Sequence, residues 1–239
     1  MKTKHQITLT AEQAGEVLSP ILSVVMSMDS GRAQYWIGRK KKLEKEVRKV
    51  LIGQDGNQYA DTIQGWQNFW RKITDQEYNF STIRIPERPE GKWRLLIIVD
   101  IPLERLYIEC KKRFSCWRRT DKDFDEIVTE NERDAKNGPY AIWVKDEAEA
   151  DENLRNFSAN DIKAKNLATE TLAEKFIHEL KFVDETGGHL DVKNITLCSG
   201  SRYGDGGVPG VGWRGGEMRV SWYHSGITGD DLRARETVS

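Results

Sequence analysis

The chain has 239 residues and a formal net charge of −1, from 37 Lys and Arg against 38 Asp and Glu. Its 38% hydrophobic residues, with eight Trp among them, are enough to fill a core, which excludes a wholly disordered chain. The longest purely aliphatic run, Leu95 to Val99, is far shorter than the roughly 20 residues that a membrane helix needs. We therefore expect a soluble globular protein with no membrane partner.

The charge is unevenly distributed along the chain. Residues 1–119 carry 22 bases and 14 acids, a net charge of +8, whereas residues 120–239 carry 15 bases and 24 acids, a net charge of −9. Opposite charges on two halves of a chain pair either internally or between copies. Self-association through opposite charge is therefore one predicted partnership, and a protein-interaction module is one predicted function.

Cysteine usage favours a reducing environment. Cys110, Cys116 and Cys198 are an odd number and have no C-x-x-C spacing, which excludes a disulfide framework and a zinc ribbon. Cys198 precedes a glycine-rich stretch, but without a nucleophile motif around it we expect a small buried side chain. The predicted location is the cytoplasm.

The first part of the chain is predicted to be helical. Thr10 followed by Gln13 indicates a capping box, and Pro20 is expected to kink or restart the helix that it opens. A second helix is predicted over residues 31–52, with Gly53 as its stop signal.

A third helix is predicted from about residue 61, with Trp66 and Trp70 on one side. Beyond it the hydrophobic pattern changes from helical to extended. We therefore predict two parts, an N-terminal helical segment over residues 1–57 and an α+β domain over residues 58–239.

Strands and helices alternate in the predicted domain. Residues 81–85 and 93–101 are expected to form a β-hairpin, and Pro102 to open a helix. A shorter helix is predicted over 123–133 and a strand over 140–144.

The C-terminal half continues this alternation. Ser158 with Asp161 predicts the cap of a short helix, and a longer helix over 170–185 is expected to end at Gly187. His178 should lie on the polar side of that helix, in solvent.

Two strands, over 190–199 and 217–223, are predicted to end the fold, joined by a loop over 200–216 with eight glycines in seventeen residues. Its Arg, Tyr and Trp side chains make this loop a candidate binding loop. The predicted fold class is α+β, with N-terminal helices and a mixed, mainly antiparallel sheet flanked by helices.

Two basic segments suggest nucleic-acid binding. Segment 38–49 has a net charge of +5 and segment 104–119 a net charge of +4, and bases interleaved with aromatic rings suit phosphate contacts and base stacking. The predicted phosphate contacts are Lys40, Lys41, Lys42, Arg48, Lys111, Lys112, Arg113, Arg118 and Arg119, with Trp117 as a stacking ring. The leading hypothesis is thus a DNA- or RNA-binding protein. The alternative is that the acidic stretch 120–155 neutralises these bases.

A metal-dependent nuclease or phosphotransfer enzyme is the enzymatic alternative. Asp191 and Lys193 are two residues apart on a predicted strand and should face the same way, as in the D-x-K half of such a site. Asp100 or Asp184 would supply the second acid. Mg²⁺ or Mn²⁺ would be needed only in this case, and otherwise no cofactor is expected.

Several motifs resemble segments of a family of uncharacterised bacterial proteins. They are GWQNFW, WRLLIIV, CWRRTD, NGPYAIWV, TGGHLDVKNITLCSGSR and VPGVGW, spread over about residues 65–235. The family has no assigned activity, so the resemblance implies no catalytic residue. It implies a bacterial cytoplasmic origin and one structural unit over that span.

Overall fold

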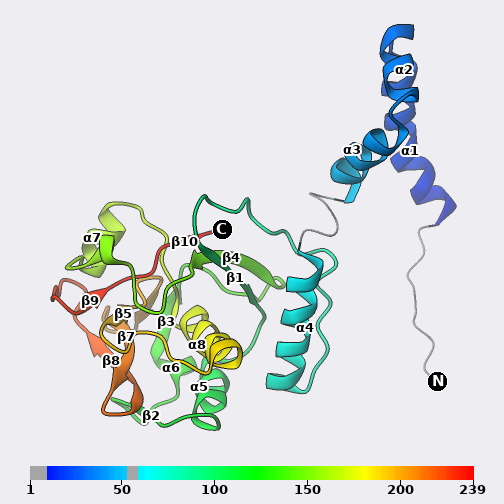
Figure 1. Cartoon of the computed structure of the whole chain (residues 1–239). Helices are drawn as coiled ribbons and strands as arrows, with labels where there is room; N and C mark the ends of the chain where they lie inside the picture. Colours follow the sequence, from blue (N-terminus) through cyan, green and yellow to red (C-terminus); the bar gives the residue numbers. More distant parts are fainter. Residues whose placement is uncertain (1–9, 53–58) are drawn as a thin grey trace. The chain divides into compact units, whose positions relative to one another are not determined.

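The computed structural model describes residues 10–52 and 59–239. The chain divides into two compact units, Met1–Gln64 and Gly65–Ser239, which we describe separately (Figure 1). The predicted boundary after residue 57 lies within the stretch that is not described. Among the described residues, no helix is both long and apolar enough to cross a membrane.

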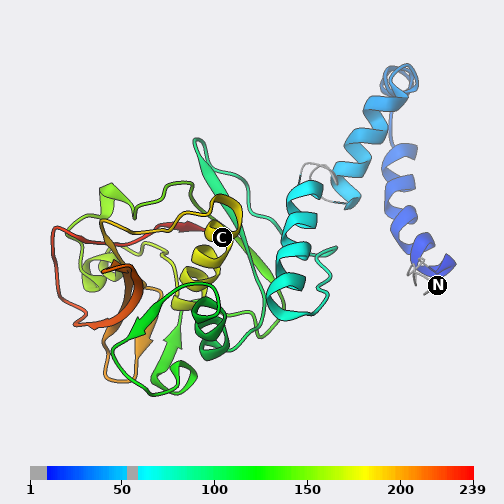
Figure 2. The same cartoon turned by 60° about the horizontal axis from the view of Figure 1, so that its bottom comes forward.

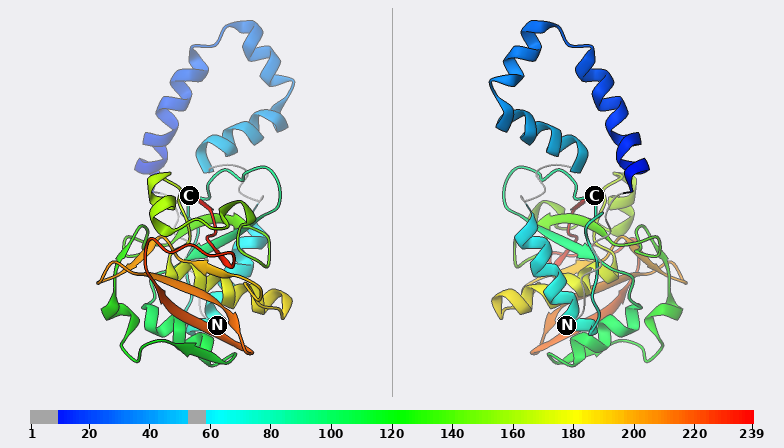
Figure 3. Two further views of the ribbon diagram at one scale, coloured as in Figure 1. Left: turned by 90° about the vertical axis from the view of Figure 1, so that its left-hand side faces the viewer. Right: turned by 90° about the vertical axis from the view of Figure 1, so that its right-hand side faces the viewer.

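In its described residues the first unit contains α1 (Ala11–Met26), α2 (Ser30–Ile37), α3 (Lys40–Ile52) and the first residues of α4 (Ala60–Thr74), seen in two orientations in Figure 3. The predicted capping box of Thr10 is confirmed, and α1 continues through Pro20 without a restart. The predicted single helix over 31–52 is wrong, because the chain turns at Gly38 and divides it into α2 and α3. The predicted stop at Gly53 lies outside the described residues.

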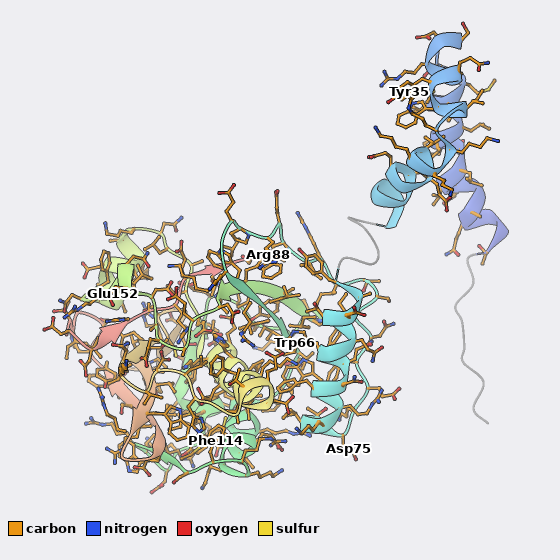
Figure 4. The ribbon with its side chains drawn as sticks, viewed as in Figure 1. Tyr35, Trp66, Asp75, Arg88, Phe114 and Glu152 are labelled. Atoms are coloured by element: carbon orange, nitrogen blue, oxygen red, sulfur yellow. The ribbon has the colours of Figure 1, made fainter. Side chains whose placement is uncertain are left out.

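Helix α4 (Ala60–Thr74) is anchored to the second unit by its aromatic side. Trp66, Phe69 and Trp70 are at most 2% exposed. The indole N–H groups of Trp66 and Trp70 donate to the carbonyl oxygens of Leu95 and Ile97, at 3.2 and 3.0 Å. Figure 4 shows Trp66 on the side of α4 that faces the rest of this unit. The predicted tryptophan stripe is therefore a packing surface.

The strand that receives α4 is β1 (Trp93–Ile98), and it pairs antiparallel with β4 (Tyr140–Lys145). Strand β10 (Thr237–Val238) pairs with the other side of β4, giving the order β1-β4-β10. The predicted hairpin between 81–85 and 93–101 is wrong, since no strand lies between α4 and β1. Pro86 and Pro89 remove two backbone donors from the loop before β1, which disfavours a ladder there.

A five-stranded sheet forms the other side of the unit. Its order is β2 (Cys116–Arg118), β8 (Glu217–Tyr223), β7 (Val208–Arg214), β5 (Ile195–Leu197) and β9 (Leu232–Arg233). The β2–β8 and β5–β9 pairs are parallel and the other two are antiparallel. A separate pair joins β3 (Val128–Asn131) to β6 (Ser201–Tyr203). The fold is α+β, as the sequence predicts.

The glycine-rich stretch is mostly strand, so the predicted loop over 200–216 is wrong. It contains β6 and β7. At Gly212, an added Cβ would lie 2.6 Å from the carbonyl oxygen of Asn194, so glycine there allows β5 and β7 to pack closely. Gly215 and Gly216 have φ angles of +63° and +81° and form the tight turn into β8.

The remaining helices pack around or between the sheets. They are α5 (Leu103–Lys111), α6 (Phe124–Ile127), a 3-10 turn (Glu152–Leu154), α7 (Ala159–Ala164) and α8 (Leu172–Thr186). The predicted helix over 123–133 is shorter than expected, because the chain becomes strand β3 at Val128. The caps predicted at Ser158 and Gly187 are confirmed, and Gly187 has the left-handed conformation, with φ +70°.

Helix α8 lies in the interior of the second unit, beside α5 and β1 (Figures 1 and 2). Its predicted apolar stripe is buried, but so are five charged or titratable side chains on its other faces, Glu174, Lys175, His178, Glu179 and Lys181. His178 is fully buried, so the prediction that it is solvated is wrong. Each of these buried groups needs an internal partner.

Candidate nucleic-acid interface

The second basic segment, residues 104–119, forms α5, β2 and the turn between them. Lys112 and Arg113 both contact Glu109, with nitrogen to oxygen distances of 2.7 and 2.8 Å. Burial acts to raise the pKa of Glu109, but the hydrogen bonds from these two bases outweigh it and the pKa is lowered. Lys112 and Arg113 thus neutralise an acid of their own segment.

Arg118 is a structural residue. Its Nη1 lies 2.6 Å from Oε2 of Glu104, and its guanidinium lies over the rings of Tyr107 and Phe124, at 5.2 and 5.4 Å. Its Nη2 also donates to the carbonyl oxygen of Asp121. Arg118 is therefore paired inside the fold and is not free to contact a phosphate.

The three remaining predicted contacts of this segment, Lys111, Trp117 and Arg119, reach solvent. Lys111 and Arg119 are exposed. Trp117, on β2, is 38% exposed, and the guanidinium of Arg219 on the neighbouring strand lies 4.8 Å from its ring centroid. The predicted stacking ring is thus accessible, but Arg219 already lies over it.

The first basic segment belongs to the other unit. Lys40, Lys41 and Lys42 are exposed in the first turn of α3. Arg48 is in the same helix, but its side chain is outside the described residues.

A hollow of about 650 Å³ lies next to the second segment. It is lined by the segment that follows β2 and continues through α6 into β3, by the end of β6, and by β8. Its lining residues are Arg119, Thr120, Lys122, Phe124, Glu126, Ile127, Thr129, Tyr203, Gly204, Asp205, Val220 and Trp222. Its volume is in the range of small-molecule sites.

Trp222 is held in a defined position at this hollow. Its indole N–H donates to Oδ1 of Asp205, at 3.0 Å. A Cβ at Gly207 would overlap the indole, so the ring lies directly against the backbone of that glycine. The hydrogen bonds from the indole of Trp222 and the backbone N–H of Gly207 lower the pKa of Asp205. Asp205 is therefore an ionised acceptor that orients the ring.

A second hollow, of about 720 Å³, lies by Arg133 and Tyr140. Arg133 Nε and the Tyr140 hydroxyl both donate to the buried carboxylate of Glu174, at 2.8 and 2.9 Å. These groups serve to neutralise a charge of α8, which makes this hollow a weaker candidate for a ligand.

The three predicted catalytic residues do not form one site. The predicted strand over 190–199 begins only at Ile195, so Asp191 and Lys193 precede it. Asp191 is fully buried with φ +56°, whereas Lys193 is exposed, so the two side chains do not face the same way. Asp100 is exposed after β1. Asp184 pairs with Lys72 on the surface.

Asp191 is the centre of a buried ion network. Its Oδ2 lies 2.6 Å from Nζ of Lys175 and its Oδ1 lies 2.7 Å from Nη2 of Arg235. The hydroxyl of Thr196 donates to Oδ2, also at 2.6 Å. Burial acts to raise the pKa of Asp191, but the positive charges of Arg235 and Lys175 outweigh it and the pKa is lowered. The carboxylate is fully occupied by these partners.

His178 and Cys198 are also buried. Nδ1 of His178 lies 2.7 Å from Oε1 of Glu170, and both side chains are fully buried. Burial raises the pKa of Glu170 to about 7 and, with the charges of Arg235 and Lys175, lowers that of His178. Burial raises the pKa of the Cys198 thiol well above its usual value, which makes it a poor nucleophile.

Among the described residues, no group of three or more His, Cys, Asp or Glu is placed to hold a metal ion. The site features missed by the sequence analysis are Trp222, Lys122 and Asp205. They are distant in sequence from one another, and the only local sign was the presence of Tyr and Arg near the glycines.

No family model, no curated protein and no solved structure matches the chain. The resemblance to uncharacterised bacterial proteins stays an expectation.

Proposed function

We propose that the protein binds nucleic acid through the exposed bases beside β2. The observation that carries this proposal is that Lys111, Trp117 and Arg119 are exposed, while Lys112, Arg113 and Arg118 are paired with acids. The remaining base of the segment, Arg105, donates to the backbone carbonyl oxygen of Thr74. Exposed bases release counterions when they meet phosphates, and exposed rings stack on bases. Lys40, Lys41 and Lys42 supply a second exposed basic group on the other unit.

Equilibrium binding at low and high salt tests the proposal. The double variant Lys111→Glu, Arg119→Glu should lose about tenfold or more in affinity for DNA or RNA and should show a smaller salt slope. The matched control is Lys92→Glu, Lys193→Glu, which makes the same change in net charge at exposed positions elsewhere. Equal loss in both double variants would show a nonspecific charge effect and would sink the proposal, as would no binding at low salt.

The geometry gives the nuclease alternative no support. Asp191 would have to leave Lys175 and Arg235 to bind a metal, which would leave two buried cations without a counter-charge. The free cysteines Cys110, Cys116 and Cys198 are consistent with the proposed cytoplasmic location.

A further inference from the structure

The hollow beside β2 combines an apolar interior with a charged rim. Phe124, Tyr203 and Val220 are each at most 8% exposed and form its apolar part. Trp222 is half-buried and lines the same hollow. A flat ring is the kind of ligand that such a surface accommodates.

Trp222 meets such a ligand without having to be ordered first. The backbone of Gly207 supports the ring, and the hydrogen bond to Asp205 fixes its rotation. A side chain that is already held in place loses little conformational entropy on binding. Trp117, by contrast, is 38% exposed on β2 and lies under the long side chain of Arg219.

The rim offers groups for an anion. Arg119 and Lys122 are exposed and line the hollow together with the acid Glu126. Asp205 adds a second negative charge, but it is engaged by Trp222 and Gly207. A ligand that carries both a ring and a phosphate would use the two bases as well as the indole.

We infer that this hollow is a stacking site for an unpaired nucleobase, with Trp222 as the platform and Arg119 and Lys122 contacting the attached phosphate. The inference rests on the proposed function and deepens it, because it specifies single strands. A base inside a duplex has both faces covered by its neighbours and cannot stack on a protein ring. The full chain therefore binds a single-stranded oligonucleotide more tightly than a duplex of the same sequence.

Fluorescence anisotropy with matched single-stranded and duplex oligonucleotides tests the inference. Trp222→Ala should lower the affinity for the single strand about five- to hundredfold, the range for loss of one stacked base, and Trp222→Phe should retain most of it. Trp93→Ala is the matched control, since it truncates another half-buried tryptophan that lies outside the hollow and outside the bases beside β2. Equal affinity for single strand and duplex, or no effect of Trp222→Ala in a folded variant, would overturn the inference.

Two further measurements keep the result decisive. Lys122→Ala changes an exposed side chain and should weaken single-strand binding several-fold, so it decides the case if circular dichroism shows that Trp222→Ala is unfolded. Adenosine monophosphate should quench the tryptophan fluorescence of the wild type and not that of Trp222→Phe to the same extent. If oligonucleotides bind through Lys111 but without preference for single strands, the stacking site is refuted and the proposed function stands. If the mononucleotide binds and no oligonucleotide does, the stacking site stands and the proposed function is refuted.

Discussion

Asp191 shows how strongly a single residue is committed to the fold. It is the counter-charge for both Lys175 and Arg235, and all three side chains are at most 1% exposed. Asp191→Asn would leave two buried cations without a full counter-charge, and we expect the free energy of unfolding to fall by about 3–5 kcal/mol. Urea denaturation measures this. The control Lys193→Ala, at an exposed site two residues away, should change stability by less than about 0.5 kcal/mol. A similar small change in both variants would contradict the prediction.

The buried pair of Glu170 and His178 predicts a pH dependence of stability. The pKa of Glu170 is raised to about 7, so the folded state keeps a proton that the unfolded state loses above its ordinary pKa of 4.5. This contribution is fully present below pH 4.5 and is lost as the pH rises through about 7. The pKa of His178 is lowered, so its contribution is present above its ordinary value of 6.5 and is lost as the pH falls. The two contributions oppose each other in the acid range.

Replacing the carboxyl group of Glu170 separates its contribution to stability from that of His178. Glu170→Gln keeps a polar partner for His178 but removes the titration of the carboxyl group. As the pH rises from about 5 to about 8, the wild type loses the contribution of Glu170 and the variant does not. The free energy of unfolding of the variant should therefore rise by roughly 1 to 3 kcal/mol relative to that of the wild type. Chemical denaturation over this range is the measurement. A constant difference between the two proteins would show that Glu170 does not titrate there.

Two glycines, one in a helix and one in a strand, predict opposite effects of a Gly→Ala substitution on stability. Gly65 lies within α4 with no atom near the position of a Cβ, so Gly65→Ala should stabilise the helix by about 0.5–1 kcal/mol. Gly212 lies in β7, where a Cβ would meet the backbone of Asn194, so Gly212→Ala should destabilise by about 1–3 kcal/mol. Thermal unfolding of both variants checks the pair, and a loss of stability in Gly65→Ala would refute the first half.

Elements with local signals were predicted well, and elements defined by distant partners were not. The capping boxes at Thr10 and Ser158 involve residues three apart, and both are confirmed. Strands β1 and β4 were both predicted from their apolar runs, but their pairing was not, because the partner of a strand is not encoded next to it. Strand β7 was missed because glycine usually signals a loop, whereas here it allows two strands to approach.

The same distinction explains the site residues. On a helical wheel His178 lies on the polar side and looks exposed. In the folded chain it is buried against Glu170, which precedes the helix and contacts its ring. The hollow at Trp222 is built from three segments, residues 119–129, 203–205 and 220–222. The sequence analysis identified Arg119 in the first segment but had no means of joining it to the ring of Trp222 in the third.

The whole molecule consists of two units with different kinds of stabilisation. None of the described side chains in α1, α2 or α3 is buried, whereas the described core begins at Trp66 and continues to the end of the chain. The charge asymmetry has a related explanation. Much of the positive excess of the first half is the exposed lysines of α3, and part of the rest, such as Arg118, is neutralised inside the second unit.

This separation predicts the properties of a chain that begins at Tyr59. It keeps α4 and the whole core, so its melting temperature should lie within about 2–4 °C of that of the full chain, the shift expected for a change of about 1 kcal/mol in a unit of this size. It lacks Lys40, Lys41 and Lys42, and each phosphate contact to a single strand contributes about 0.7 to the salt slope. If all three lysines contact the strand, the slope should therefore fall by about 2. Thermal circular dichroism and salt titrations of oligonucleotide binding measure the two effects. A large drop in melting temperature would show that the N-terminal unit stabilises the core, and an unchanged slope would restrict the interface to the bases beside β2.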